Sequence, residues 1–297
     1  MKFKLSEEVS GALHFGRPIV ALESTVIAHG LPFPDNLETA YKLERLIRQR
    51  DCVPATIALF DGEVHIGLTD EHLEKLARGE SVRKFTVRDL PFATFAKHTG
   101  ATTVASSIFI ARRAGIKVFA TGGIGGVHRG ERGDVSADLV ELSRTQIVVV
   151  SSGAKIVLDL KATREWLETF GVTVLGWQSD EFPAFYSRQS GLKVDFKVDS
   201  AREVAKIAEA REDLEHQAAI LVTVPIPEQF EIPSNELEEM LAAALKQAKE
   251  HRITGKDITP FLLENLAKSS DKRTTRANIA LLENNAKVAA EIAKAIG

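Results

Sequence analysis

Short hydrophobic runs alternate along the chain with longer segments in which apolar residues recur at helical spacing. The runs Ile19–Leu22, Val118–Ala120 and Ile147–Val150 are brief, mostly β-branched or aliphatic, and followed by small or polar residues, which predicts buried strands. Segments such as 37–47, where apolar side chains repeat every three or four positions, predict helices with one buried face. This alternation predicts an α/β fold with three layers, α/β/α, around a central sheet that is mostly parallel.

One segment departs from the parallel pattern. Residues Val53–Leu68 read as two strands joined at Asp61-Gly62, a dipeptide that suits a tight hairpin turn. Strands joined by such a turn are antiparallel, so the expected sheet is mixed. No repeat, low-complexity tract or shift in composition divides the chain, and we therefore expect a single domain over residues 1–297.

Three predicted helices accompany the candidate chemistry. One covers Gly100–Ala114 and begins with small residues, and a second begins close to Lys155 and ends at Gly171. The closing helix, Arg276–Ile296, is amphipathic and carries Asn278, Asn284 and Asn285. Because asparagine is only a middling helix former, we expect Asn278, near the start of this helix, to face a polar partner or ligand.

Composition narrows the class of protein. The chain has 38 basic and 41 acidic residues, a formal net charge of -3, which gives no field suited to nucleic acid or an anionic membrane. The single cysteine, Cys52, can form no internal disulfide, which suits a reducing cytoplasm. No apolar run reaches the roughly 20 residues of a membrane-spanning helix, and the first residues lack a secretory signal. We expect a cytoplasmic protein that binds a small molecule.

Candidate chemistry gathers where the predicted strands end. Glu23 follows the first strand, at the position where open α/β sheets bind ligands. Thr121 and a glycine-rich loop, Gly122–Gly126, follow the second, and backbone N–H groups in such a loop can cradle a phosphate. Small residues and then Lys155 follow the third. Glycine-rich turns also occur without a ligand and lysines near helix starts are often surface charges, so both readings stay open at this point.

Other charged and aromatic residues also allow two readings. Asp134 and Asp138 lie four positions apart, so on a helical turn both carboxylates would face a cation or a sugar hydroxyl. Arg88 and Asp89 fit a structural ion pair, whereas the nearby Lys84 could reach a sugar or phosphate oxygen. The aromatic residues of 182–186 follow two acids and could stack on a planar base, fill the core or form a subunit contact.

Ten segments, spread from Pro18 to Ala290, carry a resemblance to a known family: ALESTVIAHGLPFP, PATIALFDGEVHIGL, RDLPF, GATTVASSIFIA, TGGIGGVHRG, DVSADL, SSGAK, SDEFPAFY, GKDITPFLL and NIALLENNAKVA. The sequence resembles the pseudouridine-5'-phosphate glycosidases, the indigoidine synthase A-like family. The resemblance implies the family's own α/β/α fold, a manganese ion and a homotrimer. It also implies reversible cleavage of the C–C glycosidic bond of pseudouridine 5'-phosphate to uracil and ribose 5-phosphate.

The resemblance also implies roles for individual residues. The lysine nucleophile of the family falls on Lys155, the general acid on Glu23 and the metal-binding aspartate on Asp134. Its substrate contacts fall on Lys84, the backbone at Val104, Ser136, Ala137, Asp138 and Asn278. To these we add Thr121 and nearby N–H groups as phosphate ligands, with His128 and Arg129 beside them. The connection at 131–133, before the DVSADL motif, is short, which leaves the metal geometry of this loop open.

The nature of the C–C glycosidic bond determines which chemical steps these residues must perform. A C–C glycosidic bond offers no leaving oxygen or nitrogen to protonate, so the usual pair of carboxylates is poorly suited. Protonation of the ribose ring oxygen by Glu23 would instead open the ring, and an uncharged Lys155 could add at C1' and form an imine-type electron sink. Alternatives are a sugar kinase, an N-ribosyl hydrolase or a non-catalytic nucleotide-binding subunit.

Overall fold

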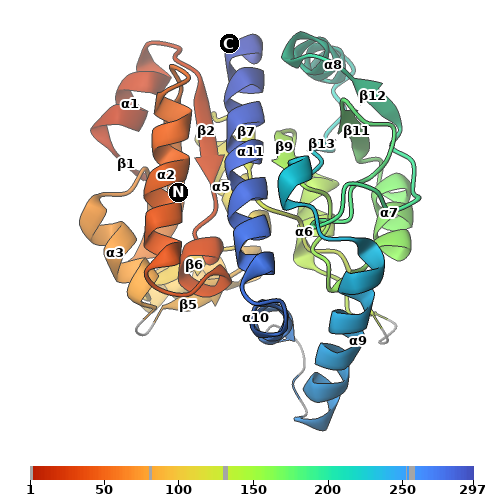
Figure 1. The fold of residues 1–297 in the computed structure, drawn as a ribbon. Coiled ribbons are helices and arrows are strands. Elements are labelled where there is room, and N and C mark those ends of the chain that lie inside the picture. Colours follow the sequence, from red (N-terminus) through yellow and green to blue (C-terminus); the bar gives the residue numbers. More distant parts are fainter. Residues whose placement is uncertain (1–2, 80–81, 130–132, 252, 254–257) are drawn as a thin grey trace.

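The computed structural model describes residues 3–79, 82–129, 133–251, 253 and 258–297, and its strands build one large sheet (Figure 1). The strands of this sheet are β1 Phe3–Leu5, β2 Ile19–Leu22, β3 Val53–Phe60, β4 Glu63–Ile66, β5 Arg83–Phe85, β6 Gly100–Thr102, β7 Val118–Ala120, β9 Val148–Ser151, β11 Thr173–Trp177, β12 Phe196–Val198 and β13 Ile220–Thr223. Two further strands, β8 Val127–His128 and β10 Leu158–Asp159, pair separately.

The order along the sheet is β1-β4-β3-β2-β7-β9-β13-β11-β12, with β6 on β3 and β5 on β6. The neighbours from β3 to β12 along this path are parallel, whereas β3 is antiparallel to β4 and β6. The predicted mixed, mostly parallel sheet and its hairpin are therefore confirmed. At the hairpin turn, Asp61 and Gly62 have φ values of 52° and 80°, as a turn with two left-handed residues requires.

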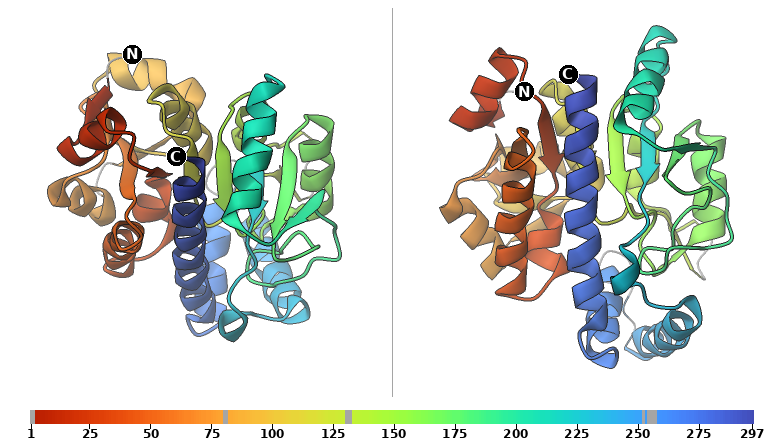
Figure 2. Two further views of the ribbon diagram at one scale, coloured as in Figure 1. Left: turned by 90° about the horizontal axis from the view of Figure 1, so that it is seen from above. Right: turned by 45° about the horizontal axis from the view of Figure 1, so that its top comes forward.

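Helices cover both faces of the sheet, which confirms the predicted three layers (Figures 1 and 2). Helix α11 lies along β2, β7 and β9 and contacts α2 and α8, whereas α5 packs on β2 and β3 from the other side and contacts α6. Within the part of the chain that the structure describes, no helix combines the length and apolar character needed to cross a membrane. The helices are α1 Glu7–His14, α2 Asp35–Arg48, α3 Asp70–Arg78, α4 Leu90–Phe95, α5 Val104–Arg113, α6 Ala137–Leu142, α7 Leu160–Thr169, α8 Ala201–Asp213, α9 Ser234–Glu250, α10 Ile258–Ser269 and α11 Arg273–Ile296.

Two predicted helix starts are wrong; pairing with neighbouring strands explains the first and a helix cap the second. Residues Gly100–Thr102 form β6, because they pair with β3 and β5, and the helix begins only after the N-cap Thr103. The helix expected to begin near Lys155 begins at Leu160, where the side chain of Asp159 accepts a hydrogen bond from the Ala162 N–H at 2.9 Å. Lys155 therefore lies on a loop rather than on a helix.

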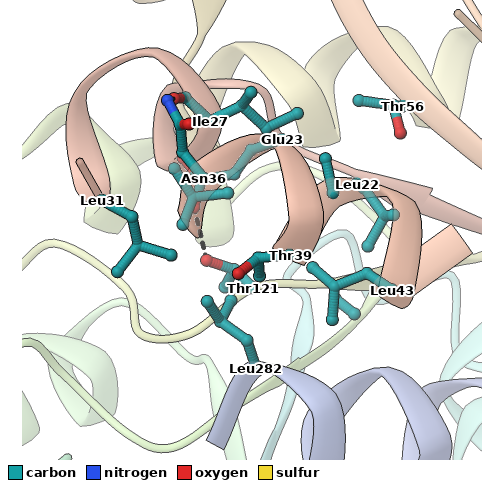
Figure 3. A pocket seen from close by; sticks show the side chains of 13 residues that line it. Leu22, Glu23, Ile27, Leu31, Asn36, Thr39, Leu43, Thr56, Thr121 and Leu282 are labelled. Carbon is teal, nitrogen blue, oxygen red and sulfur yellow. Dashed lines mark hydrogen bonds between the residues drawn. The ribbon is translucent and has the colours of Figure 1, made fainter. Parts of the chain in front are cut away.

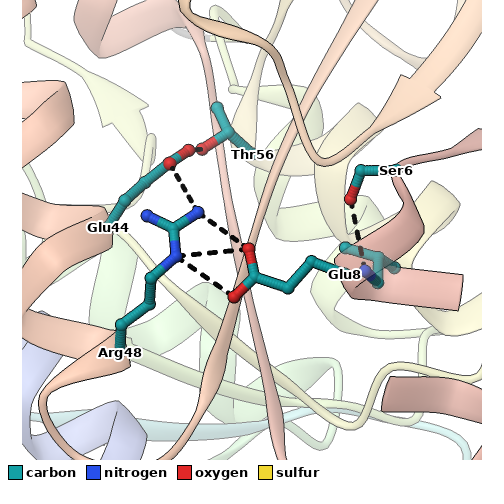
Figure 4. Close-up of polar contacts among 6 residues, drawn as sticks. Ser6, Glu8, Glu44, Arg48 and Thr56 are labelled. Atoms are coloured by element: carbon teal, nitrogen blue, oxygen red, sulfur yellow. Dashed lines mark hydrogen bonds and ion pairs between the residues drawn. The ribbon is translucent and has the colours of Figure 1, made fainter. Parts of the chain in front are cut away.

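A buried glutamate joins α2 to the sheet and to α1 (Figure 4). The Thr56 hydroxyl donates to Glu44 at 2.7 Å, and Arg48 donates to Glu44 at 3.3 Å and to Glu8 at 2.9 Å. Burial raises the pKa of Glu44, and the hydrogen bond from Thr56 and the charge of Arg48 only partly oppose this. The contact is structural, because Glu44 lies outside the pocket described below.

Candidate active site

Three parallel neighbours, β2, β7 and β9, end at the same edge of the sheet. Their registers align Leu22 with Ala120, and Ala120 with Val150. The residues that follow these strands, Glu23, Thr121 and the loop to Lys155, are thus brought together, as the sequence predicted. In Figure 1 the helix α10 lies beyond this edge, below the start of α11.

A pocket at this edge collects five of the ten predicted site residues. It is lined by Glu23, Lys84, Thr121, Lys155 and Asn278, together with Thr25, Val26, His29, Gly30, Gly122, Gly123, Phe185 and Leu263. An outer cavity of about 620 Å³ adjoins it and shares four of these residues, which are His29, Gly30, Leu263 and Asn278. The two cavities therefore lie side by side at this edge of the sheet.

Glu23 is a buried acid in the wall of this pocket. Its side chain is buried, and the Thr121 hydroxyl donates to Glu23 Oε1 at 2.5 Å (Figure 3). Figure 3 draws a second, neighbouring pocket whose wall also includes Glu23 and Thr121. There, apolar side chains such as Leu22 and Leu282 lie around these two residues. Burial raises the pKa of Glu23, and the charge of Lys155, the hydrogen bond from Thr121 and the charge of Lys84 offset part of this rise. A carboxyl that keeps its proton to higher pH is suited to act as a general acid.

Lys155 is held by its backbone against the glycine-rich loop. The Lys155 N–H donates to the Ile124 carbonyl at 3.1 Å, and the Ile124 N–H donates to the Gly153 carbonyl at 3.0 Å. The residues that follow, Ile156 and Val157, are buried, and the lysine itself is half-buried. The amine is close enough for its charge to act on Glu23, so the two predicted catalytic residues share one pocket.

The glycine-rich loop is shaped by close packing more than by an open anion cradle. A Cβ on Gly123 would lie 2.7 Å from the ring of Phe185, and one on Gly125 would lie 2.2 Å from Ser136 Oγ, so neither position admits a side chain. The Ile124 and Gly125 N–H groups already donate within the protein. Of the loop, Thr121, Gly122 and Gly123 line the pocket, so only this first part is placed to meet a ligand.

Asp138 links two walls of the site through backbone amides. Its Oδ1 accepts from the Ala105 N–H at 2.9 Å and its Oδ2 accepts from the Gly125 N–H at 2.8 Å. The carboxylate thereby fixes the start of α5, which includes the buried Val104, against the glycine-rich loop. Ser136 is the N-cap of α6 and Ala137 its first residue. Within the described residues, neither of these two nor Asp138 or Val104 lines the pocket, so their predicted substrate contacts stay predictions.

Asp134 does not share a helical face with Asp138. Helix α6 begins at Ala137, so Asp134 precedes it, and its carbonyl accepts from the His128 N–H at 2.9 Å. Among the described residues, none donates a hydrogen bond to the Asp134 carboxylate or forms an ion pair with it, and no three His, Cys, Asp or Glu residues cluster as a metal site. One hard oxygen ligand fits a cation that keeps most of its waters. Of the short connection at 131–133, residues 131 and 132 lie outside the described residues.

The remaining sequence predictions divide between site and scaffold. Arg129 donates to the Leu158 carbonyl at 3.0 Å and His128 belongs to β8, so the structure does not bring either residue to the pocket. Arg88 and Asp89 do form an ion pair, at 3.6 Å. The aromatic segment 182–186 fills the core, although Phe185 also lines the pocket. Thr25 and Leu263 also line the pocket, although the sequence did not point to either residue.

Comparison with known proteins places this arrangement in a family. A family model described as indigoidine synthase A like protein matches residues 8–295. The chain belongs to this family. The indigoidine synthase A-like chain is 48% identical over 291 residues to a pseudouridine-5'-phosphate glycosidase of Geobacillus kaustophilus, covering 97% of each chain. It is 49% identical over 304 residues to a protein of the same name from Symbiobacterium thermophilum, covering 100% of this chain and 99% of the relative.

Two solved structures share the fold of this family member. An indigoidine synthase A-like protein of Thermotoga maritima has a TM-score of 0.90 and 39% identity, with 98% of this chain and 96% of the other covered. The prealnumycin C-glycosynthase AlnA, solved with ribulose 5-phosphate, has a TM-score of 0.91 and 38% identity, with coverages of 99% and 96%. These likenesses confirm the predicted fold class.

Proposed function

We propose that this protein reversibly cleaves the C–C glycosidic bond of pseudouridine 5'-phosphate, giving uracil and ribose 5-phosphate. The observation that carries the proposal is the buried Glu23, with its raised pKa, in the same pocket as Lys155. Relatives with nearly half of their residues identical are named for this activity, and the C-glycosynthase neighbour binds a pentose phosphate.

The proposed mechanism begins at the ribose ring. Glu23 donates its proton to the ring oxygen while the Lys155 amine adds to C1', so the C1'–N bond forms as the C1'–O bond breaks. The nitrogen, now a positively charged secondary ammonium, gives up one proton and regains a lone pair. This lone pair forms a C=N bond as the electrons of the C1'–C5 bond leave with uracil, and one proton is taken up at C5 in place of the proton lost from nitrogen. Water adds to the imine and releases the aldehyde form of ribose 5-phosphate, which restores the lysine.

The carboxyl and the amine have separate duties in this scheme. The lysine must be uncharged to add to carbon, and Glu23 must carry the proton that it donates. Lys84 and Asn278, which line the same pocket, are placed to hold polar groups of the substrate. Neither a kinase nor an N-ribosyl hydrolase requires an amine that bonds to C1'.

A synthesis assay tests the proposed function. The protein is mixed with Mn²⁺, uracil and ribose 5-phosphate, and the products are separated and weighed by mass spectrometry. We expect pseudouridine 5'-phosphate, identified by a base that acid hydrolysis does not release. A nucleotide with an N-glycosidic bond, a phosphorylated sugar formed only with ATP, or no product at all would contradict the proposal and favour one of the alternatives.

The pH dependence of cleavage should report the state of Glu23. Activity requires the protonated carboxyl, so kcat/KM should fall as the pH rises through the raised pKa of Glu23. The Thr121 hydroxyl favours the carboxylate, so Thr121→Val should raise this pKa further and shift the fall to higher pH. Thr145→Val, which removes a similar hydrogen bond to the buried Glu141, is the control and should leave the profile in place. A shift to lower pH in Thr121→Val would contradict this assignment.

A bound manganese ion would offset negative charge near the substrate and order water molecules there. We propose that Asp134 supplies its protein carboxylate. Asp134→Asn should then raise the Mn²⁺ concentration needed for half-maximal activity about tenfold or more, measured after removal of metal with a chelator. Asp213→Asn, at an exposed acid on α8, should leave this concentration unchanged. Equal metal dependence in Asp134→Asn and the unaltered protein would exclude Asp134 as the ligand.

Assembly and location also belong to the proposal. We propose one domain over residues 1–297, a homotrimer and a cytoplasmic location. Phe92 and Phe95 of α4 are 48% and 90% exposed, an apolar surface that assembly would cover. A buried, unpaired Cys52 and a phosphorylated substrate suit a reducing compartment inside the cell. Light scattering after size-exclusion chromatography should give three times the mass of the chain.

A further inference from the structure

Asn285, in the middle of α11, is a fully buried amide that contacts both loops of the site. Its exposed fraction is 0%, although the helix around it is rich in alanine and leucine. Its Nδ2 donates to the Thr121 carbonyl at 2.8 Å and to the Gly122 carbonyl at 3.3 Å. Its Oδ1 accepts from the Ser152 hydroxyl at 3.2 Å. Leaving a buried amide without hydrogen-bond partners costs free energy, so these three hydrogen bonds favour one arrangement of the two loops.

Two of the three partners of Asn285, Thr121 and Ser152, lie next to a predicted catalytic residue in space or in the chain. Thr121, whose carbonyl accepts from Asn285, donates its hydroxyl to Glu23. Ser152, which donates to Asn285, lies three positions before Lys155 on a loop without helical structure. The Ser152 N–H also donates to the Gly122 carbonyl at 2.8 Å, so one set of hydrogen bonds joins the two loops.

Gly122 packs closely against α11. A Cβ at this position would lie 3.2 Å from Leu281 Cδ1 and 3.3 Å from Leu282 Cδ2, so these two leucine side chains would have to shift by a few tenths of an ångström. The glycine thus suits the close approach of α11 to the loop that Asn285 bonds. The neighbouring Asn284 offers a contrast, since it is half-buried and donates only to the Pro225 carbonyl at 3.4 Å, away from the pocket.

We infer that Asn285 is a positioning residue for the proposed reaction: it sets the distance between the Thr121–Glu23 pair and the loop that carries Lys155. The inference rests on the proposed function, because the two groups must meet opposite sides of one C1'–O bond. Asn285 does not line the pocket and acts only through its neighbours. Misplacing a reacting group by about 1 Å can cost 10²-fold in rate.

The test compares Asn285→Leu and Asn285→Asp with Asn284→Leu and Asn284→Asp. Leucine removes all three hydrogen bonds at similar volume, and aspartate keeps the acceptor for Ser152 but loses the donor to the two carbonyls. We expect both Asn285 variants to lose roughly 30-fold to 100-fold in kcat per folded molecule, with KM changed less than threefold. The Asn284 variants should stay within twofold of the unaltered protein in both constants. Thermal unfolding gives the folded fraction of each sample.

A second readout separates positioning from simple stabilisation. Amide hydrogen exchange at 121–124 and 152–155 should become faster in Asn285→Leu while the central strands keep their protection. Should the Asn285 variants fail to fold, Ser152→Ala removes only one of the bonds and should still lower kcat about threefold to tenfold.

The inference would be overturned if folded Asn285 variants kept an unchanged kcat per folded molecule. If the Asn285 variants do not fold, an unchanged kcat in Ser152→Ala would overturn it. Absence of C–C cleavage by the unaltered protein would instead overturn the proposed function, and the exchange measurement would still test whether Asn285 orders both loops.

Discussion

Lys155→Ala should lower kcat for cleavage of pseudouridine 5'-phosphate by a factor on the order of 10⁴ or more, as expected when a covalent nucleophile is removed. Among the described residues, Lys84 is the other amine of this pocket; it lies on β5, and the proposed mechanism assigns it to hold the substrate rather than to bond to C1'. Because the substrate contacts proposed for Lys84 and Asn278 do not involve Lys155, binding of ribose 5-phosphate should weaken much less than turnover. Steady-state kinetics and isothermal titration measure the two effects.

The matched control for this substitution is Lys161→Ala. Lys161 is an exposed lysine of α7, six positions further along the chain. Its removal should leave kcat within twofold of the unaltered protein. A Lys155→Ala protein that is folded and retains more than about a tenth of the original kcat would show that the nucleophile has been misassigned.

Glu23→Gln should abolish most of the turnover and stabilise the folded protein at the same time. Loss of a general acid costs roughly 10²-fold to 10⁴-fold in rate, and glutamine cannot donate the required proton. Burial raises the pKa of Glu23 in the folded state above its unfolded value, so the unfolded chain loses this proton first. The free energy of unfolding of the unaltered protein therefore falls as the pH rises from the unfolded pKa of Glu23 to its raised folded pKa. Glutamine carries no ionisable proton, so the variant does not lose this stability. We expect a gain on the order of 1 kcal/mol near neutral pH that disappears below about pH 4.5.

Glu44→Gln provides the control for the stability effect. Glu44 also has a pKa raised by burial but lies outside the pocket. The stability gained by Glu44→Gln in thermal unfolding should depend on pH in the same way as that of Glu23→Gln. The gain should be smaller, because the ionic contact with Arg48 is lost, and kcat should be unchanged. If Glu23→Gln were destabilised near neutral pH, or retained full activity, the proposed role of Glu23 as a buried acid would be wrong.

The sheet could be predicted because its signals are local. The strands Ile19–Leu22 and Val118–Ala120 are where the hydrophobic runs placed them, and the Asp61-Gly62 turn fixed the antiparallel hairpin. Parallel strands end at one edge, so the meeting of Glu23 and Lys155 followed from the strand assignments. The errors at Gly100 and after Lys155 arose where pairing with a distant strand or a cap decided the backbone, which local spacing does not encode.

The site could be predicted only in part. Residue types and strand ends pointed to Glu23, Thr121 and Lys155. Spacing and helix propensity also singled out Asp134 and Asn278, but only the resemblance gave these two the specific roles of metal ligand and substrate contact. Two backbone amides donate hydrogen bonds to Asp138 because α5 packs against the glycine-rich loop. No pattern in the sequence predicts that packing. Asn285 was visible only as one of several asparagines in the last helix, because a single amide among alanines and leucines leaves the helical periodicity unchanged.

The most direct test of the central claim is a trapping measurement on Lys155. The protein is incubated with ribose 5-phosphate, reduced with borohydride, digested and analysed by tandem mass spectrometry. We predict that the peptide containing Lys155 gains the mass of a reduced pentose phosphate, and that Glu23→Gln still forms this adduct from the free aldehyde. An adduct confined to another lysine, or no adduct in a protein that turns over its substrate, would contradict a mechanism in which the Lys155 amine bonds to C1'.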